Sequence, residues 1–150
     1  MGHNISALIA KAPIDMDAAR QFDLPVFVQG GYAIVALHYE HCDHWTEKLG
    51  IEPCAGAWSI VLDLPVTHEF ARRLGLGIYA LIETNYFGGL GDQCAAVYHG
   101  DRVEMEPTKG GINAALRMLG VERQPDLDEF DTIGLGRHRS FDDHFEKYWR

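Results

Sequence analysis

Three glycines fall within four residues of the segment Glu83-Thr84-Asn85-Tyr86-Phe87-Gly88-Gly89-Leu90-Gly91-Asp92-Gln93. Apolar, strand-like runs precede and follow this segment, at residues 78–82 and 94–98. Glycine reaches positive φ without a Cβ clash and allows another backbone to come close. The pattern therefore predicts two paired strands joined by a wide hairpin or a bulged turn.

The same glycines could instead form a phosphate-binding loop. Gly89-Leu90-Gly91 supplies the first two glycines of a dinucleotide fingerprint but lacks the third, and Asp92 would repel a phosphate. Such a loop opens a helix, whereas residues 94–98 indicate a strand. The sequence thus favours a turn and predicts no cofactor. We expect this turn to display Asn85, Tyr86, Asp92 and Gln93 to a protein partner.

The chain outside this segment alternates irregularly between strand and helix patterns. At the amino-terminal end we expect a strand at residues 5–10, a helix capped by Asp15 or Asp17, and a hairpin around Gly30-Gly31. A helix ending at Gly50 should follow. A strand at residues 59–64 and a helix at residues 68–74, capped by Thr67, should then lead to the glycine-rich segment. Downstream, we expect a strand at residues 103–106, an amphipathic helix at residues 112–119, and a final helix whose capping box is Ser140 with Asp143.

This order lacks the strict strand–helix alternation of a doubly wound sheet. The length and the hydrophobic fraction, 150 residues and 47%, suit one ordinary core. The sequence predicts an α+β fold, a single domain over residues 1–150 with a mixed, mostly antiparallel sheet and short helices packed on it.

Charge and cysteine content restrict the partners and the compartment. The chain carries 13 Lys and Arg against 22 Asp and Glu, a net charge of −9. Such a surface repels nucleic acid and attracts basic proteins, although acidity also serves solubility alone. No apolar run approaches the length of a membrane span. Cys42, Cys54 and Cys94 form no CxxC pair, and the amino terminus lacks signal-peptide features, so we expect reduced thiols and a cytoplasmic location.

The densest cluster of ionisable residues runs from His38 to His44 and contains every common type of zinc ligand. On a helix, His38 and His44 lie about 9 Å apart along the axis, so three histidines do not converge on one ion. His41 and His44 alone could share one. The spacing predicts no metal site. The alternative function is a small-molecule or metal-dependent enzyme that uses this cluster or the Gly88–Gly91 loop.

A second unusual segment, Asp128 to Arg139, changes abruptly from acidic to basic. We expect an irregular surface loop with Asp128, Asp131 and Arg137 as partner contacts. Arg137 and Arg139 either bind a carboxylate or pair internally with acidic residues of the chain, and the acidic composition favours internal pairing with Asp142 and Asp143.

Three segments resemble a family of small uncharacterised bacterial proteins: Glu83–Gln93, Gly111–Val121 and Asp128–Arg139. The resemblance implies a compact mixed fold and a bacterial origin, and it carries no catalytic residues. In size and charge the chain is similar to immunity proteins, which neutralise a cognate toxin by stoichiometric binding. We therefore expect a cytoplasmic immunity protein with a more basic toxin domain as its partner. A third hypothesis is a homo-oligomer formed through aromatic residues near Tyr148 and Trp149.

Overall fold

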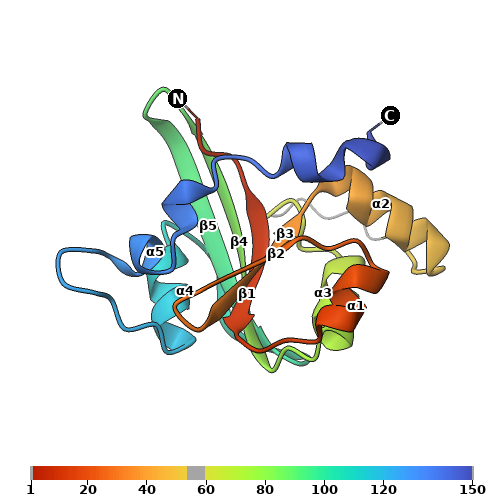
Figure 1. Cartoon of the computed structure of the whole chain (residues 1–150), viewed down its shortest axis with the longest axis horizontal. Coiled ribbons are helices and arrows are strands. Elements are labelled where there is room, and N and C mark those ends of the chain that lie inside the picture. Colours follow the sequence, from red (N-terminus) through yellow and green to blue (C-terminus); the bar gives the residue numbers. More distant parts are fainter. Residues whose placement is uncertain (1, 54–59, 150) are drawn as a thin grey trace.

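A computed structural model describes residues 2–53 and 60–149 of the chain. Its centre is a twisted, six-stranded antiparallel sheet with the order β2-β3-β1-β4-β5-β6 (Figure 1). The strands are β1 (Ser6–Lys11), β2 (Val26–Gln29), β3 (Tyr32–Leu37), β4 (Ile78–Phe87), β5 (Leu90–His99) and β6 (Arg102–Lys109). The helices are α1 (Met16–Gln21), α2 (Tyr39–Lys48), α3 (Pro65–Arg73), α4 (Ile112–Met118) and α5 (Glu129–Thr132), with 3-10 helices η1 (Leu135–Arg137) and η2 (Asp142–Tyr148).

The sheet is buried on both faces, because successive side chains of a strand point to opposite sides. Leu8 and Leu81 pack on one face with α1, α2 and α3, which contribute side chains such as Phe70. Ile9 and Ile82 pack on the other face with α4, α5 and the 3-10 segments. This arrangement confirms the α+β prediction, and it leaves the ends of the longest strands, β4 and β5, extending beyond the helices (Figure 1).

The β4–β5 hairpin has a tight two-residue turn rather than the wide or bulged turn that the sequence predicted. Phe87 pairs with Leu90, and Gly88 and Gly89 between them have φ values of 61° and 81°. These positive angles are those of a type I′ turn, whose twist matches the strands. Gly91 has a φ of 142°, and a Cβ there would lie 1.9 Å from the carbonyl oxygen of Asn85. The glycines thus shape a hairpin and open no helix for a phosphate.

Two local predictions upstream of the hairpin were wrong. Residues 60–64 form a turn and an extended connection instead of a strand, while Ser59 lies outside the described residues. Helix α3 begins at Pro65, because proline suits the first helical position. Thr67 therefore lies inside the helix and donates its hydroxyl to the Leu62 carbonyl over 2.7 Å instead of capping. This bond ties the connection to the helix.

The structure also bears on the features behind the predicted location. Cys42 and Cys94 are free thiols buried in the core, and Cys54 lies outside the described residues. Burial raises the pKa of both thiols, so neither is an activated nucleophile. Within residues 2–53 and 60–149, no helix combines the length and the apolar character needed to cross a membrane.

Candidate functional site

A groove of about 690 Å³ lies where the sheet runs on past helices α1 to α3. It is lined by residues from five separate parts of the chain. β1 and β4 supply Ser6, Glu83, Thr84 and Asn85, the start of α2 supplies His38, Tyr39 and Glu40, the connection before α3 supplies Val61 and Leu62, and the C-terminal segment supplies Phe141, Asp142 and Trp149, with Asn4, Ile5 and Leu37 completing the lining.

Strand pairing brings the polar part of the groove together. Ser6 pairs directly with Glu83 across β1 and β4, and both continue the face that Leu8 and Leu81 occupy in the core. Asn85 follows two residues later on the same face of β4. Its pairing partner on β5 is Asp92. The apolar face of the sheet thus turns polar and acidic at its end.

Glu83 is the most unusual residue of the groove, because its carboxylate is half-buried and has no cationic partner among the described residues. Burial raises the pKa of this carboxyl above its usual value, and the Val61 amide, which donates to Oε1 over 3.4 Å, opposes that rise only in part. No basic side chain among the described residues forms an ion pair with it. A positive group entering the groove would supply the missing partner.

The start of helix α2 adds further carboxylates. His38 is the N-cap residue, and its Nδ1 accepts the Glu40 amide over 3.2 Å. In the neutral imidazole the proton is then on Nε2, which lies 3.5 Å from Oδ1 of Asp142. Glu40 of α2 and Asp142 of η2 line the same groove as Glu83 of β4.

Aromatic rings border these carboxylates. Tyr39 is 58% exposed and Trp149 is 49% exposed, although both line the groove. Aromatic faces attract ammonium and guanidinium groups, most strongly where carboxylates lie nearby. No lysine or arginine occurs among the described residues that line the groove. The arrangement is chemically suited to binding a cationic side chain.

The residues predicted around the hairpin divide between the groove and the scaffold. Asn85 lines the groove, and its neighbour Asp92 lies 3.3 Å from the Lys109 ammonium on the adjacent strand. Tyr86 points to the opposite face of β4. Gln93 has a structural role, because its Oε1 accepts the amide of Ile112 over 2.9 Å at the start of α4. Partner binding by these four residues stays a prediction.

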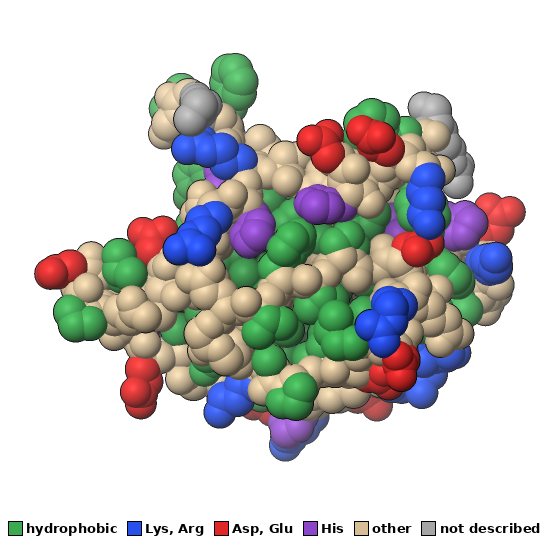
Figure 2. Space-filling view, viewed as in Figure 1, with side chains coloured by type: hydrophobic (Ala, Val, Ile, Leu, Met, Phe, Trp, Pro, Cys, Tyr) green, Lys and Arg blue, Asp and Glu red, His purple; other side chains and the backbone are tan. Residues whose placement is uncertain are grey.

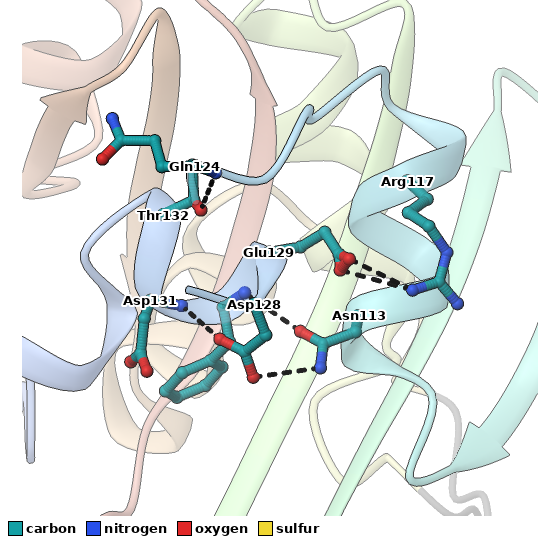
Figure 3. A network of polar contacts seen from close by, with 8 residues as sticks. Asn113, Arg117, Gln124, Asp128, Glu129, Asp131 and Thr132 are labelled. Atoms are coloured by element: carbon teal, nitrogen blue, oxygen red, sulfur yellow. Dashed lines mark hydrogen bonds and ion pairs between the residues drawn. The ribbon is translucent and has the colours of Figure 1, made fainter. Parts of the chain in front are cut away.

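Two of the three residues predicted in the second segment, Asp128 and Asp131, belong to a junction between α4 and α5 (Figure 3). Asp128 caps α5, and its Oδ1 accepts the amide of Asp131 over 2.9 Å. Asn113 of α4 donates to Oδ2 of Asp128 over 3.1 Å and accepts the amide of Phe130 over 2.9 Å. One asparagine thus holds the start of α5 against α4. The segment expected to be an irregular loop contains the short, capped helix α5 and the 3-10 helix η1.

An ion pair between the buried carboxylate of Glu129 and the exposed side chain of Arg117 completes the junction. Glu129 is 3% exposed, and its carboxylate receives Nη1 of Arg117 at 3.2 and 3.3 Å (Figure 3). Arg137 lies farther along, where it donates to Oε1 of Gln29 over 3.3 Å. The Asp128 carboxylate thus has a structural role, because both of its oxygens accept hydrogen bonds within the junction. Arg137 lies outside the junction. A partner contact at either residue stays a prediction.

The histidine cluster of α2 diverges in the structure. His38 faces the groove, whereas His41 is fully buried and donates Nε2–H to the Phe22 carbonyl over 2.6 Å. Burial lowers the pKa of His41 to about 4. His44 packs edge-on against Trp45 and Tyr148. Within the part of the chain that the structure describes, no three His, Cys, Asp or Glu residues gather as a metal site.

A second polar cluster lies behind the groove, on the connection that carries Val61 and Leu62. Asp63 accepts hydrogen bonds from the Nε2–H of His68 over 2.6 Å and from the Tyr98 hydroxyl. Although burial opposes ionisation, these bonds lower the pKa of Asp63. His68 accepts the Tyr79 hydroxyl at Nδ1 over 2.6 Å. All four side chains of this cluster have hydrogen-bond partners within it, so the cluster anchors the connection to the sheet.

No protein-family model, curated protein or solved structure matches this chain. The resemblance of its three segments to small bacterial proteins stays a prediction. Inference about function therefore starts from the groove itself.

Proposed function

We propose that the protein is a cytoplasmic binding protein whose acidic groove receives a basic side chain of a protein partner. The half-buried carboxylate of Glu83, which has no ion pair with another described residue, is the observation that carries this proposal. A lysine or arginine placed between Tyr39 and Trp149 would meet Glu83, Glu40 and Asp142. The charge-assisted hydrogen bond formed in this contact would offset the free energy that desolvation of the Glu83 carboxylate costs.

The class of partner that fits this site is a protein more basic than the chain itself. The net charge of −9 attracts such a partner from a distance, and the groove provides the specific contact at short range. An immunity protein that neutralises a basic toxin domain by stoichiometric binding has this combination of features. We propose that function for the chain, with Asn85 and Asp92 at the edge of the interface.

Affinity capture from a lysate of the cell of origin tests the proposal, with the Glu83→Gln variant as the comparison. Wild-type protein should retain a basic protein in a one-to-one complex, and Glu83→Gln should reduce its affinity at least about tenfold, as for loss of a desolvated charge pair. Glu104→Gln is the matched control, since Glu104 lies on the edge strand β6 and pairs with Arg102. Equal capture by wild type and Glu83→Gln would refute a role for the groove.

The salt dependence of the same complex tests the contribution of overall charge. Its association rate should fall as salt rises from about 0.02 M to about 0.5 M, because steering is screened beyond the Debye length. The dissociation rate should change little, since the groove contact is desolvated. An association rate that does not respond to salt would rule out electrostatic steering while leaving the groove contact to the capture experiment.

A further inference from the structure

A small basic patch interrupts the acidic surface at the connection between η1 and η2. It consists of Arg137, His138 and Arg139 together with His144 of η2. In Figure 2, Lys/Arg and His side chains gather over this stretch beside hydrophobic ones. Four basic side chains within eight residues are notable in a chain of net charge −9.

Two phenylalanine rings hold the imidazoles of the patch in place. Ring centroids of Phe27 lie 4.6 Å from His138 and 5.4 Å from His144, and Phe27 stacks on Phe141 at 5.7 Å. Phe141 is itself buried, so the base of the patch is fixed to the core. The imidazoles therefore do not separate freely to reduce their mutual repulsion when both are protonated.

The arginines of the patch have only neutral partners in the described structure. Arg137 donates to the side-chain carbonyl of Gln29 over 3.3 Å, and Arg139 donates to the backbone carbonyl of Gly2 over 3.4 Å. The predicted internal pairing with Asp142 and Asp143 is absent from the described ion pairs, in which Asp142 instead faces His38. Neutral oxygens orient both guanidinium groups without cancelling their charge.

The ionisable groups around the imidazoles confirm the sign of the local field. Burial lowers the pKa of His138, and His144, Arg137 and His3 lower it further. Asp142 and Asp143, in the first turn of η2, directly precede His144 and are the acidic residues next to it in the sequence. The positive groups dominate at His138, so an anion there would stabilise the charged imidazole.

We propose that Arg137, His138, Arg139 and His144 form a binding site for a single phosphate or carboxylate group. The site is distinct from the acidic groove and does not depend on it. Its guanidinium groups provide constant positive charge, whereas its imidazoles add charge as the pH falls. The affinity for an anion should therefore increase from about pH 8 to about pH 5.

Nuclear magnetic resonance of the histidine side chains tests this site directly in wild-type protein. The probes are sulfate, as a phosphate mimic that does not titrate in this range, and acetate, as a carboxylate, at a constant ionic strength of about 0.15 M. A bound anion should raise the pKa of His138 by about one pH unit in a saturable manner. His99, an exposed imidazole beside Arg102, is the internal control.

A response to sulfate alone would identify a phosphate-type ligand, and a response to acetate would identify a carboxylate; either supports the site. The Arg137→Gln/Arg139→Gln double variant should weaken the apparent affinity at least about tenfold, whereas Arg123→Gln, at another surface position, should not. Identical shifts at His99, no shift with either probe, or an unchanged response in the double variant would overturn the proposal.

Discussion

The α4–α5 junction and the region of α2 with its groove lie on opposite faces of one sheet, and both are rich in ionisable side chains. At the junction, Asp128 and Glu129 have hydrogen-bond partners from α4 or from their own helix. On the α2 side, Glu83 has no cation, and the buried Nδ1 of His41 has no hydrogen-bond partner among the described residues.

The comparison distinguishes polar residues that stabilise the fold from polar residues that lower its stability. A buried polar group contributes to stability only when its partners are present, and an unpartnered one is destabilising. The junction is therefore expected to be sensitive to substitution in stability measurements. The α2 side is expected to be sensitive to pH and, in the groove, to substitution in binding measurements.

The largest effect is expected at His41. Because burial lowers its pKa from 6.5 to about 4, the folded protein holds His41 neutral while the unfolded chain takes up a proton. The stability from this group is complete above pH 6.5 and falls as the pH approaches 4, a loss of about 3 kcal/mol. Chemical denaturation at a series of pH values measures it.

His41→Gln is the comparison for this prediction, since the amide retains a donor for the Phe22 carbonyl. Glutamine does not titrate, so the variant should lack most of the loss of about 3 kcal/mol that His41 causes between pH 6.5 and pH 4. Parallel pH profiles for the two proteins would contradict a neutral, buried His41.

A smaller effect is expected when the junction loses Asn113. Asn113→Ala removes one donor and one acceptor, so the Phe130 amide and Asp128 lose their shared partner. We expect the free energy of unfolding to fall by about 2 kcal/mol. Asn85→Ala, which truncates an amide in the groove, is the matched control and should stay within about 0.5 kcal/mol of wild type. Equal losses in both variants would remove the contrast between the two regions.

The smallest effect on stability is expected for Glu83→Gln. Because the pKa of Glu83 is raised by burial, the folded protein holds its proton more tightly than the unfolded chain does. Ionising the half-buried Glu83 therefore destabilises the folded protein. This destabilisation is absent below pH 4.5 and appears as the pH rises through the folded-state pKa. At neutral pH, Glu83→Gln should be as stable as wild type or more stable, by up to about 1 kcal/mol. A clear loss of stability would mean that Glu83 is structural.

Local signals in the sequence predicted most of the fold. The glycine pairs at residues 30–31 and 88–89 indicated the β2–β3 and β4–β5 hairpins. Of the two candidate caps, Asp15 and Asp17, the structure has Asp15 at the start of α1. Thr67 was misleading because a good capping residue also forms internal hydrogen bonds, and the proline two residues earlier decided where the helix begins.

The groove was harder to predict, because its residues are distant in sequence. Glu83 and Asp142 meet only after the C-terminal segment crosses the end of the sheet, and no local pattern encodes that crossing. One signal was present: Glu83 directly follows the apolar run Ile78–Ile82 on the face of β4 that Leu81 occupies in the core. The sequence indicated Asn85 because it lies beside the turn, and Asn85 does line the groove. Glu83 was not predicted as a binding residue.

The three hairpin glycines differ in what could replace them over evolutionary time. Gly88 and Gly89 have open space where a Cβ would be, so asparagine or aspartate, which tolerate left-handed backbone, could occupy the turn. Gly91 cannot accept any side chain, because the Asn85 carbonyl occupies the position of its Cβ. A distant descendant of the same ancestor could therefore lose the Gly-Gly pair and still be recognised by a glycine two residues after its turn, facing a strand with a carboxylate at an inward position.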